Sequence, residues 1–267
     1  MESETPLTAE QVIKNLRQKE DPSLRYYAAW WLGRFRVKDE EAIDALLEAL
    51  QDDTHLSPDG GYPLRRNAAK ALGKLDNSIA VLPLIESLSC TDYYVRESAA
   101  QALETLNDPR AIAPLLQLLE GGLDNAIYVD GKPHLRQPVE AAIEALGSLG
   151  ATEAIEVILP FLEHEIAKIQ YAAARALYQL TGESYYGDRL VEALSGQDLQ
   201  LRRSALMDLG AIGYYPAAKF IANTFAENSL KLISLKGLLE YQLKKNTPSE
   251  KLSPESVEIL NLMDSLL

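Results

Sequence analysis

The sequence predicts an all-α protein, an α-solenoid built as a superhelix of about seven two-helix repeats. A leucine recurs along the chain, and its equivalent positions are Leu32, Leu72, Leu103, Leu146, Leu177, Leu209 and, more weakly, Leu238. Successive members of this series are 40, 31, 43, 31, 32 and 29 residues apart, which indicates a basic unit of about 31 residues. Such a period is typical of solenoids. No stretch alternates apolar and polar residues for long, so we expect almost no β-strand.

A second register accompanies the leucines. Seven residues before them stand, in order, Arg25, Arg65, Arg96, Val139, Gln170, Arg202 and Lys231. Four residues before those stand Asp21, Gly61, Asp92, Leu135, Ile166, Asp198 and Glu227. An aspartate in the turn can cap a helix and meet an arginine one turn on or in the next repeat. We therefore interpret these acids and bases as residues of repeat stacking and not as a catalytic pair.

The first elements have clear start signals. Thr8 and Gln11 form a capping box, which predicts an N-terminal capping helix within residues 1–20. Asp21 followed by a proline starts the aromatic helix of the first repeat, and residues 40–50 form its partner. The repeats are expected to fill residues 21–241 of a single domain that covers residues 1–267.

Two long spacings indicate insertions, near residues 51–63 and 121–134, and both are rich in turn formers. Insertions in a solenoid collect on one side as loops, which is often the binding side. The second insertion supplies two candidate site residues, Asp130 and His134. The alternative is that both segments are simply solvated loops.

The C-terminal part is expected to hold a polar linker over residues 242–256 and then a short amphipathic helix over 257–267. This helix would either cap the last repeat or dock on a partner.

The helix over residues 24–35 has an unusual outer face. Tyr26, Trp30 and Arg34 fall in one row, with Tyr27 and Trp31 at its flanks. The buried stripe is expected to be Leu24, Ala28, Leu32 and Phe35. A solvated helix face should be polar, so an aromatic row predicts a contact surface for a flat conjugated ligand or a protein partner. The alternative is that preceding residues pack over the row.

Composition excludes several classes of function. Net charge is −13, from 39 acidic and 26 basic residues, which disfavours nucleic acid as a partner. No apolar run is long enough to span a membrane, and the first residues lack the pattern of a signal peptide. The single Cys90 allows no internal disulfide and fits a reducing cytoplasm; we expect it to be a packed residue. His55, His134 and His164 have no ligand spacing, so no metal site is expected.

The motif Asp-x-x-x-Arg-x-x-Ala-Ala-x-x-Leu-Gly over residues 21–33 resembles the HEAT repeat, in the short variety of phycobilisome-associated lyases. The resemblance covers residues 20–245. The segments that start at Leu24, Arg65 and Ala172 resemble the E (alpha) subunits of the E/F-type phycobilin lyases. The Tyr-Tyr-Ala-Ala-Trp-Trp stretch is the most specific part of this resemblance.

The resemblance implies a cytoplasmic, cyanobacterial-type subunit that pairs with a second HEAT-repeat subunit, F. Together the two would bind phycocyanobilin as substrate, with no permanently bound cofactor, and attach it by a thioether to a cysteine of the phycocyanin alpha subunit. Two alternatives stay open. One is the E subunit of the phycoerythrocyanin lyase-isomerase, and the other is a non-catalytic HEAT-repeat adaptor or chaperone for phycobiliproteins.

A bilin offers a flat π-system, two propionates and pyrrole N–H groups. Aromatic rings can stack on the first and cations can bind the second. Arg66 and Lys70 occupy positions equivalent to Tyr26 and Trp30, so a basic strip should lie beside the aromatic row. The candidate bilin- or partner-binding residues are therefore Tyr26, Tyr27, Trp30, Trp31, Arg34, Arg66, Lys70, Asp130 and His134. An acidic, aromatic protein surface would suit the same strip, and no catalytic residue is assigned.

Overall fold

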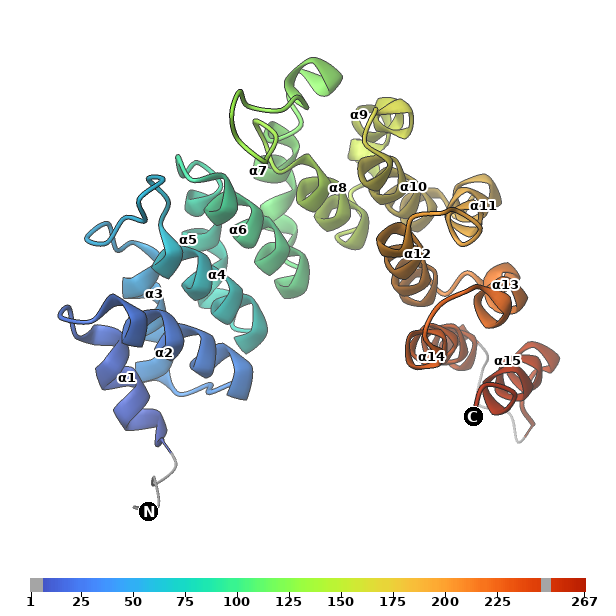
Figure 1. The fold of residues 1–267 in the computed structure, drawn as a ribbon, viewed down its shortest axis with the longest axis horizontal. Coiled ribbons are helices and arrows are strands. Elements are labelled where there is room, and N and C mark those ends of the chain that lie inside the picture. The colour runs from blue at the N-terminus through green and yellow to red at the C-terminus, as the bar shows by residue number, and fades with distance from the viewer. Residues whose placement is uncertain (1–6, 246–250) are drawn as a thin grey trace. The chain divides into compact units, whose positions relative to one another are not determined.

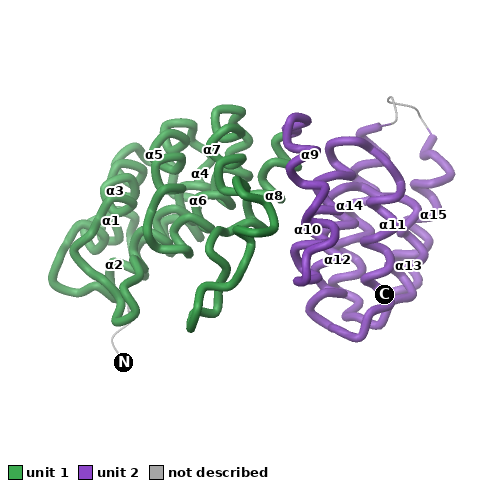
Figure 2. The backbone as a smooth tube through the Cα atoms, turned by 90° about the horizontal axis from the view of Figure 1, so that it is seen from above, with its two compact units in different colours: residues 1–149 green, residues 150–267 purple. Residues whose placement is uncertain are grey.

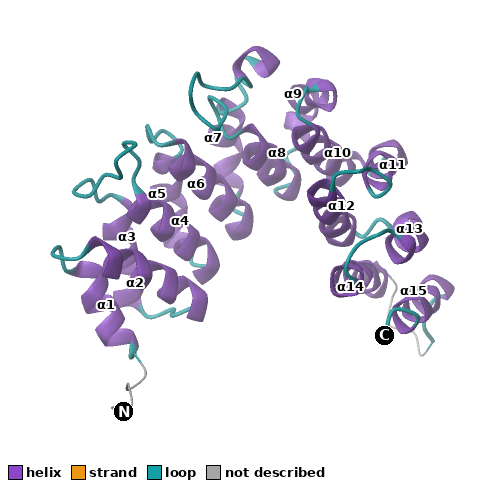
Figure 3. Ribbon diagram, viewed as in Figure 1, coloured by secondary structure: helices purple, strands orange, loops and turns teal. Residues whose placement is uncertain are grey.

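A computed structural model describes residues 7–245 and 251–267. Throughout these ranges the secondary structure is helical, apart from one isolated bridge between Tyr128 and Leu135 (Figure 3). The prediction of an all-α HEAT-repeat solenoid is confirmed. The chain divides into two compact units, residues 1–149 and 150–267 (Figure 2). The assignment of one domain to the whole chain stays a prediction.

The first unit consists of two layers of helices (Figure 1). Its helices are α1 (Ala9–Arg17), α2 (Pro22–Phe35), α3 (Glu40–Leu50), α4 (Pro63–Leu75), α5 (Val81–Ser87), α6 (Tyr93–Leu106), α7 (Ile112–Gln117) and α8 (Val139–Ser148). Short 3₁₀ helices span Ser78–Ala80, Pro109–Ala111 and Gly122–Asn125. Helices α2, α4, α6 and α8 pack side by side in chain order and form one layer, and the other helices cover it.

The second unit repeats this plan. Its helices are α9 (Ile155–Ile158), α10 (Ala167–Thr181), α11 (Ser184–Ala193), α12 (Leu199–Ile212), α13 (Ala218–Asn223), α14 (Asn228–Lys245) and α15 (Pro254–Asp264). The 3₁₀ helices are Thr152–Ala154, Leu159–Glu163 and Tyr215–Ala217. Helices α10, α12 and α14 form the continuous layer. No helix of the described chain is both long enough and apolar enough to cross a membrane.

The repeated leucines form the core of both units. All seven aligned leucines are at most 1% exposed, which confirms the predicted register. The glycine that follows the leucine in the first two repeats allows the next helix to approach closely. A Cβ atom at Gly33 would lie 2.7 Å from Ala71 Cα, and one at Gly73 would lie 2.8 Å from Ala102 Cα. Neither contact could be made by a residue with a side chain.

In every repeat except that of Val139, a polar side chain of the second register binds a carbonyl at or just beyond the end of the preceding helix. Arg25 donates to the Leu16 carbonyl at 2.9 Å, Arg65 to that of Asp52 at 2.7 Å, and Arg96 to that of Cys90 at 2.6 Å. The corresponding donors later in the chain are Gln170, Arg202 and Lys231, which bind the carbonyls of His164, Gly196 and Ala222. Helix ends leave carbonyls without partners, and these side chains satisfy them. The bases of this register thus have a structural role, but they bind backbone carbonyls and not the acids expected as their partners. Val139 is the one member of the register without a polar side chain.

The acids of the register cap helices, as expected. Asp21, Asp92 and Asp198 each accept from backbone N–H groups in the first turn of the helix that follows. The expected pairing of Asp92 needs correction, because it binds Arg66 of the preceding repeat at 2.8 Å and not Arg96 of its own.

The buried face of α2 differs from the predicted stripe. Leu24 is 44% exposed and Phe35 is 60% exposed, although both were expected in the core. The buried residues of this helix are Arg25, Ala28, Ala29, Leu32 and Gly33. This face is centred on the small residues because α2 packs against helices on two sides, α1 and α4. Leu24 and Phe35 lie near the two ends of the helix and at the edge of that face.

The chain ends follow the prediction with shifted boundaries. The capping box at Thr8 is present, and α1 ends at Arg17. Helix α14 continues to Lys245, so the predicted linker from residue 242 is wrong at its start. The last helix begins at Pro254 and not at 257, and residues 246–250 of the predicted linker lie outside the described residues. Helix α15 packs on α14 and α13, which supports a capping role.

Candidate functional site

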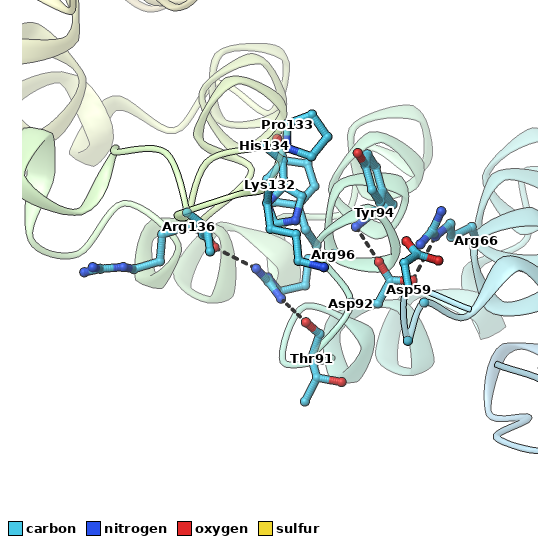
Figure 4. A pocket seen from close by; sticks show the side chains of 14 residues that line it. Asp59, Arg66, Thr91, Asp92, Tyr94, Arg96, Lys132, Pro133, His134 and Arg136 are labelled. Carbon is cyan, nitrogen blue, oxygen red and sulfur yellow. Dashed lines mark hydrogen bonds and ion pairs between the residues drawn. The ribbon is translucent and has the colours of Figure 1, made fainter. Parts of the chain in front are cut away.

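The two insertions meet at one pocket of the first unit. The pocket has a volume of about 370 Å³ and lies at the start of α6 (Figure 4). Residues 59–61 of the loop before α4 line one wall. Residues of the loop before α8, among them Lys132 and His134, line the opposite wall. Asp92, Tyr93 and Tyr94 lie between the two loops. The insertions therefore collect on one side, as expected for a solenoid.

The first loop is held by a tight turn and by the chain beneath it. Ser57 N–H donates to the Gly61 carbonyl at 2.9 Å, and Gly61 N–H donates to Ser57 Oγ at 3.0 Å. The Arg66 guanidinium lies directly against Gly61, since a Cβ atom there would be 2.1 Å from one of its nitrogens, so a larger residue would displace this guanidinium. At the start of the loop, Asp52 forms a buried ion pair with Arg25 at 2.8 Å. Burial raises the pKa of Asp52, but hydrogen bonds from Arg25 and Thr54 outweigh this and hold that pKa at about 2.

The second loop folds back on itself and is tied to α6. Val129 N–H donates to the His134 carbonyl at 3.1 Å, and Arg136 N–H donates to the Ile127 carbonyl at 2.9 Å. The guanidinium of Arg96 donates to the Arg136 carbonyl at 2.7 Å and to the Gln137 side chain at 3.1 Å. Arg96 thus holds this loop beside the first turn of α6.

Aromatic rings form one wall of the pocket. The His134 ring stacks on Tyr93, with centroids 4.4 Å apart and planes 13° apart. Tyr94 meets Tyr93 edge-on at 5.2 Å, and the Arg66 guanidinium lies 4.4 Å from the centre of the Tyr94 ring. Burial raises the pKa of Tyr93 far above its usual range, and the carboxylates of Glu97 and Glu140 raise it further. Tyr93 therefore stays protonated at neutral pH.

Asp92 is fixed by several donors. It accepts from Arg66 at 2.8 Å, from Tyr62 N–H at 2.7 Å and from Tyr94 N–H at 2.9 Å. Burial raises its pKa, but these hydrogen bonds bring the pKa of Asp92 below the ordinary value. Asp92 is thus an anion that neutralises Arg66 and is not available as a proton donor.

The aromatic row of α2 lies on the surface of the same unit. Tyr27 is 47% exposed and Trp30 is 46% exposed, and their ring centroids are 5.5 Å apart. Trp31 is half-buried and packs on Phe35 at 4.6 Å. Tyr26 is also half-buried, and Arg34 is exposed. The outer face of α2 therefore presents aromatic rings to its surroundings.

The row and the pocket are connected through α4. The Asn67 side chain donates to the Tyr26 carbonyl at 3.2 Å, and its chain neighbour Arg66 lines the pocket. Lys70 follows one turn later on α4 and is exposed. Asn67 thus links the α2 backbone at Tyr26 to the part of α4 that carries Arg66.

Comparison with known proteins gives a consistent result. Residues 55–126 and 139–210 match the family described as HEAT repeats, and residues 24–52 match the PBS lyase HEAT-like repeat. The phycocyanobilin lyase subunit alpha of Picosynechococcus sp. strain PCC 7002 is 64% identical over 97% of this chain and 96% of its own length. The subunit of that name from Synechocystis sp. strain PCC 6803 is also 64% identical, over 97% of this chain and 96% of its length. The chain belongs to the family of phycocyanobilin lyase alpha subunits.

A solved structure agrees with this family. A chain in the complex of CpcE and CpcF of phycocyanin lyase from Nostoc sp. PCC7120 is 57% identical to this one, with a TM-score of 0.92. The match covers 100% of this chain and 98% of that chain. The fold of the described residues therefore agrees with that of a chain in this complex.

The structure brings together only some of the residues predicted for the site. Arg66 and His134 line the pocket, and the residues of α2 lie on the neighbouring surface. Asp130 is exposed at the tip of the second loop and does not line the pocket. Across the described residues, no group of three or more histidine, cysteine or acidic side chains could hold a metal ion.

Sequence reasoning did not assign Tyr93, Tyr94 or Lys132 to the site, and it gave Arg96 only a role in repeat stacking. Two adjacent tyrosines directly after the capping Asp92 were a usable signal, because the first turn of a helix after a cap lies at the edge of the layer, where the insertions also emerge. Lys132 carried no signal of its own, since its position depends on how the second loop folds.

Proposed function

We propose that this chain is the alpha subunit of a heterodimeric bilin lyase. With an F-type subunit it would bind phycocyanobilin and attach it through a thioether to a cysteine of the phycocyanin alpha subunit. The full-length relation to phycocyanobilin lyase alpha subunits carries this proposal. The relation to a chain of the CpcE–CpcF complex supports the heterodimer. The names of these relatives do not favour the non-catalytic adaptor or the lyase-isomerase.

In this proposal the outer face of α2 receives the conjugated rings of the bilin. Trp30 and Tyr27 form an exposed aromatic pair on which a flat π-system can stack. Arg34 and Lys70 place positive charge beside it. The acceptor thiol adds across the ethylidene double bond of the first ring, so the carbon–sulfur bond forms and the thiol proton passes to the conjugated system. The task of this chain is to hold the bilin in an orientation that allows this addition.

The bilin is a passing substrate in this scheme, and no cofactor is bound permanently. The scheme also places the protein in the cytoplasm, which the single Cys90 supports because disulfides have no part in the fold. A specific contact with the F-type subunit should bury more than about 1,000 Å².

The test is a reconstitution with purified components. The chain, an F-type subunit, phycocyanobilin and the apo-phycocyanin alpha subunit are mixed, and covalent bilin is measured on the denatured acceptor by absorbance and fluorescence. We expect the acceptor to become coloured only when both lyase subunits are present. An acceptor that stays colourless with every bilin and F-type partner tried would reject the lyase function. A product with an isomerised chromophore spectrum would indicate the lyase-isomerase.

A further inference from the structure

We propose that the pocket between the two insertion loops binds one propionate carboxylate of the bilin, with Lys132 as its direct donor. This proposal rests on the function proposed above and adds to it a site for a defined chemical group.

The charge of the pocket fits a single carboxylate. Arg66, Arg96 and Lys132 are its cations, and Asp59 and Asp92 are its anions. The guanidinium of Arg136 is directed away from the pocket in Figure 4 and binds the Asn125 side chain at 2.7 Å. The lining side chains therefore carry one more positive than negative charge on a protein whose net charge is −13; Glu97 and Glu140 act on the Tyr93 hydroxyl but do not line the pocket. A partly enclosed positive site favours one anionic group over a neutral or cationic one.

The cations have different tasks. Arg66 is neutralised by Asp92, and Arg96 donates to the carbonyls of Cys90, Thr91 and Arg136. These two arginines therefore stabilise the walls of the pocket through bonds within the protein. Lys132 extends from the second loop into the space between the loops, as Figure 4 shows, and it is exposed. An ammonium group on a flexible stem can turn toward an incoming carboxylate and donate to it.

The aromatic wall of the pocket fits the pyrrole ring that carries the propionate. Tyr93 and His134 form a parallel stack, and Tyr94 stands beside it. A pyrrole ring can rest against such a surface while its propionate reaches the lysine. Phosphate would use the charge of the pocket and leave the aromatic wall unused.

The position of the pocket fits a ligand that is also bound at α2. Asn67, which follows Arg66 in α4, donates to the Tyr26 carbonyl of α2. In this proposal a tetrapyrrole anchored by one propionate in the pocket extends its other rings along α4 toward α2. The second propionate would then lie outside the pocket.

The test compares phycocyanobilin with its dimethyl ester, in which both propionates are neutral. Binding to the complex of this chain with its F-type subunit is measured by the change in bilin absorbance. We expect the acid to bind at least about tenfold more tightly than the ester, because the ester loses the charge-assisted hydrogen bond to Lys132. Lys132→Ala should lower this preference by about tenfold and Lys132→Glu should lower it further, while ester binding is unchanged.

Lys14→Ala is the matched control, because Lys14 is an exposed lysine of α1 in the same unit and does not line the pocket. It should keep the wild-type preference for the acid. Equal affinity of the wild-type complex for acid and ester would overturn the proposal, as would a loss in Lys132→Ala that is the same for both ligands. Weaker pairing of Lys132→Glu with the F-type subunit, with bilin binding intact, would assign the pocket to a protein carboxylate and also overturn it. Transfer activity in the wild-type mixture separates all these outcomes from a failure of the lyase function itself.

Discussion

An ion pair between an arginine and an acid occurs at equivalent repeat positions in the two units, but its exposure to solvent differs. Arg66 and Asp92 join two successive repeats of the first unit, and Arg203 and Glu227 join two repeats of the second. Both arginines lie six residues before an aligned leucine, and both acids lie eleven residues before the next one. The Asp92 side chain is 3% exposed, whereas that of Glu227 is 45% exposed.

The difference comes from the insertion. The loop before α4 folds over the first pair, and Tyr62 N–H and the Tyr94 ring complete its surroundings. The second pair has no such loop and lies open to solvent. A repeat contact that serves stacking in one unit thus becomes the wall of a pocket in the other. The helical framework is common to both units, and the loops decide where a site forms.

Removing a core leucine should lower the free energy of unfolding by a similar amount in either unit. Leu103→Ala and Leu177→Ala should each lower the free energy of unfolding by about 2–5 kcal/mol, because each leaves a cavity among stacked helices. Leu82→Ala, at a side chain that is 55% exposed, is the control and should change it by less than about 0.5 kcal/mol. Urea denaturation midpoints measure these changes. A loss below half a kcal/mol at either core leucine would show that the repeat register is wrong.

The two ion pairs should differ clearly in their contribution to the free energy of unfolding. Asp92→Asn should lower the free energy of unfolding by about 1–3 kcal/mol, because it leaves Arg66 without its anion and weakens bonds to two backbone N–H groups. Glu227→Gln should leave stability unchanged, because exposed ion pairs contribute little. Thermal unfolding of both variants, side by side, measures the contrast. Equal losses would mean that the insertion does not alter the energetic role of the pair.

The aromatic row has a matched position in the second unit. Trp30 and Met207 both lie two residues before an aligned leucine, and they are 46% and 44% exposed. Trp30→Ala should reduce bilin transfer by about tenfold, because a stacking surface is lost, with little change in stability. Met207→Ala should leave transfer unchanged. If Trp30→Ala unfolds the protein, or transfers at the wild-type rate, the row is structural or idle.

The ion pair between Arg25 and Asp52, at the start of the first loop, should make the free energy of unfolding depend on pH. The pKa of Asp52 falls from its ordinary value of 3.8 to about 2 on folding, so its contribution to stability is present above pH 3.8 and is lost as pH falls toward 2. Asp52→Asn should therefore show a smaller loss of stability over this range than the wild type. Asp44→Asn, at an exposed residue of α3, serves as the control. Parallel curves for wild type and Asp52→Asn would reject this account of the anchor.

The framework could be predicted from the sequence because it depends on local periodicity. The aligned leucines, the caps at Asp21 and Asp92 and the helix starts all follow from residues close together in the chain. Leu24 and Phe35 were misplaced because their burial depends on how far the neighbouring helices extend.

The pocket could be predicted only in outline. Its two loops were recognised by their spacing and composition, but which of their residues face inward depends on contacts 26 to 41 residues apart in sequence, such as Arg66 with Asp92 and Arg96 with Gln137. Asp130 and His134 therefore looked alike as candidates. The fold of the second loop exposes one and stacks the other on Tyr93.

The side chains that close helix ends also govern where the chain can be divided. The donor for the end of α1 is Arg25 of α2, and the donor for the end of α3 is Arg65 of α4. During synthesis a repeat closed by such a donor is therefore finished only when the first turns of the next repeat have emerged from the ribosome. A truncated protein that stops at a repeat boundary keeps carbonyls without partners, whereas one that includes the first two turns of the following helix retains the closing bond. Fragments of this protein are thus best ended inside a helix and not in the loop before it.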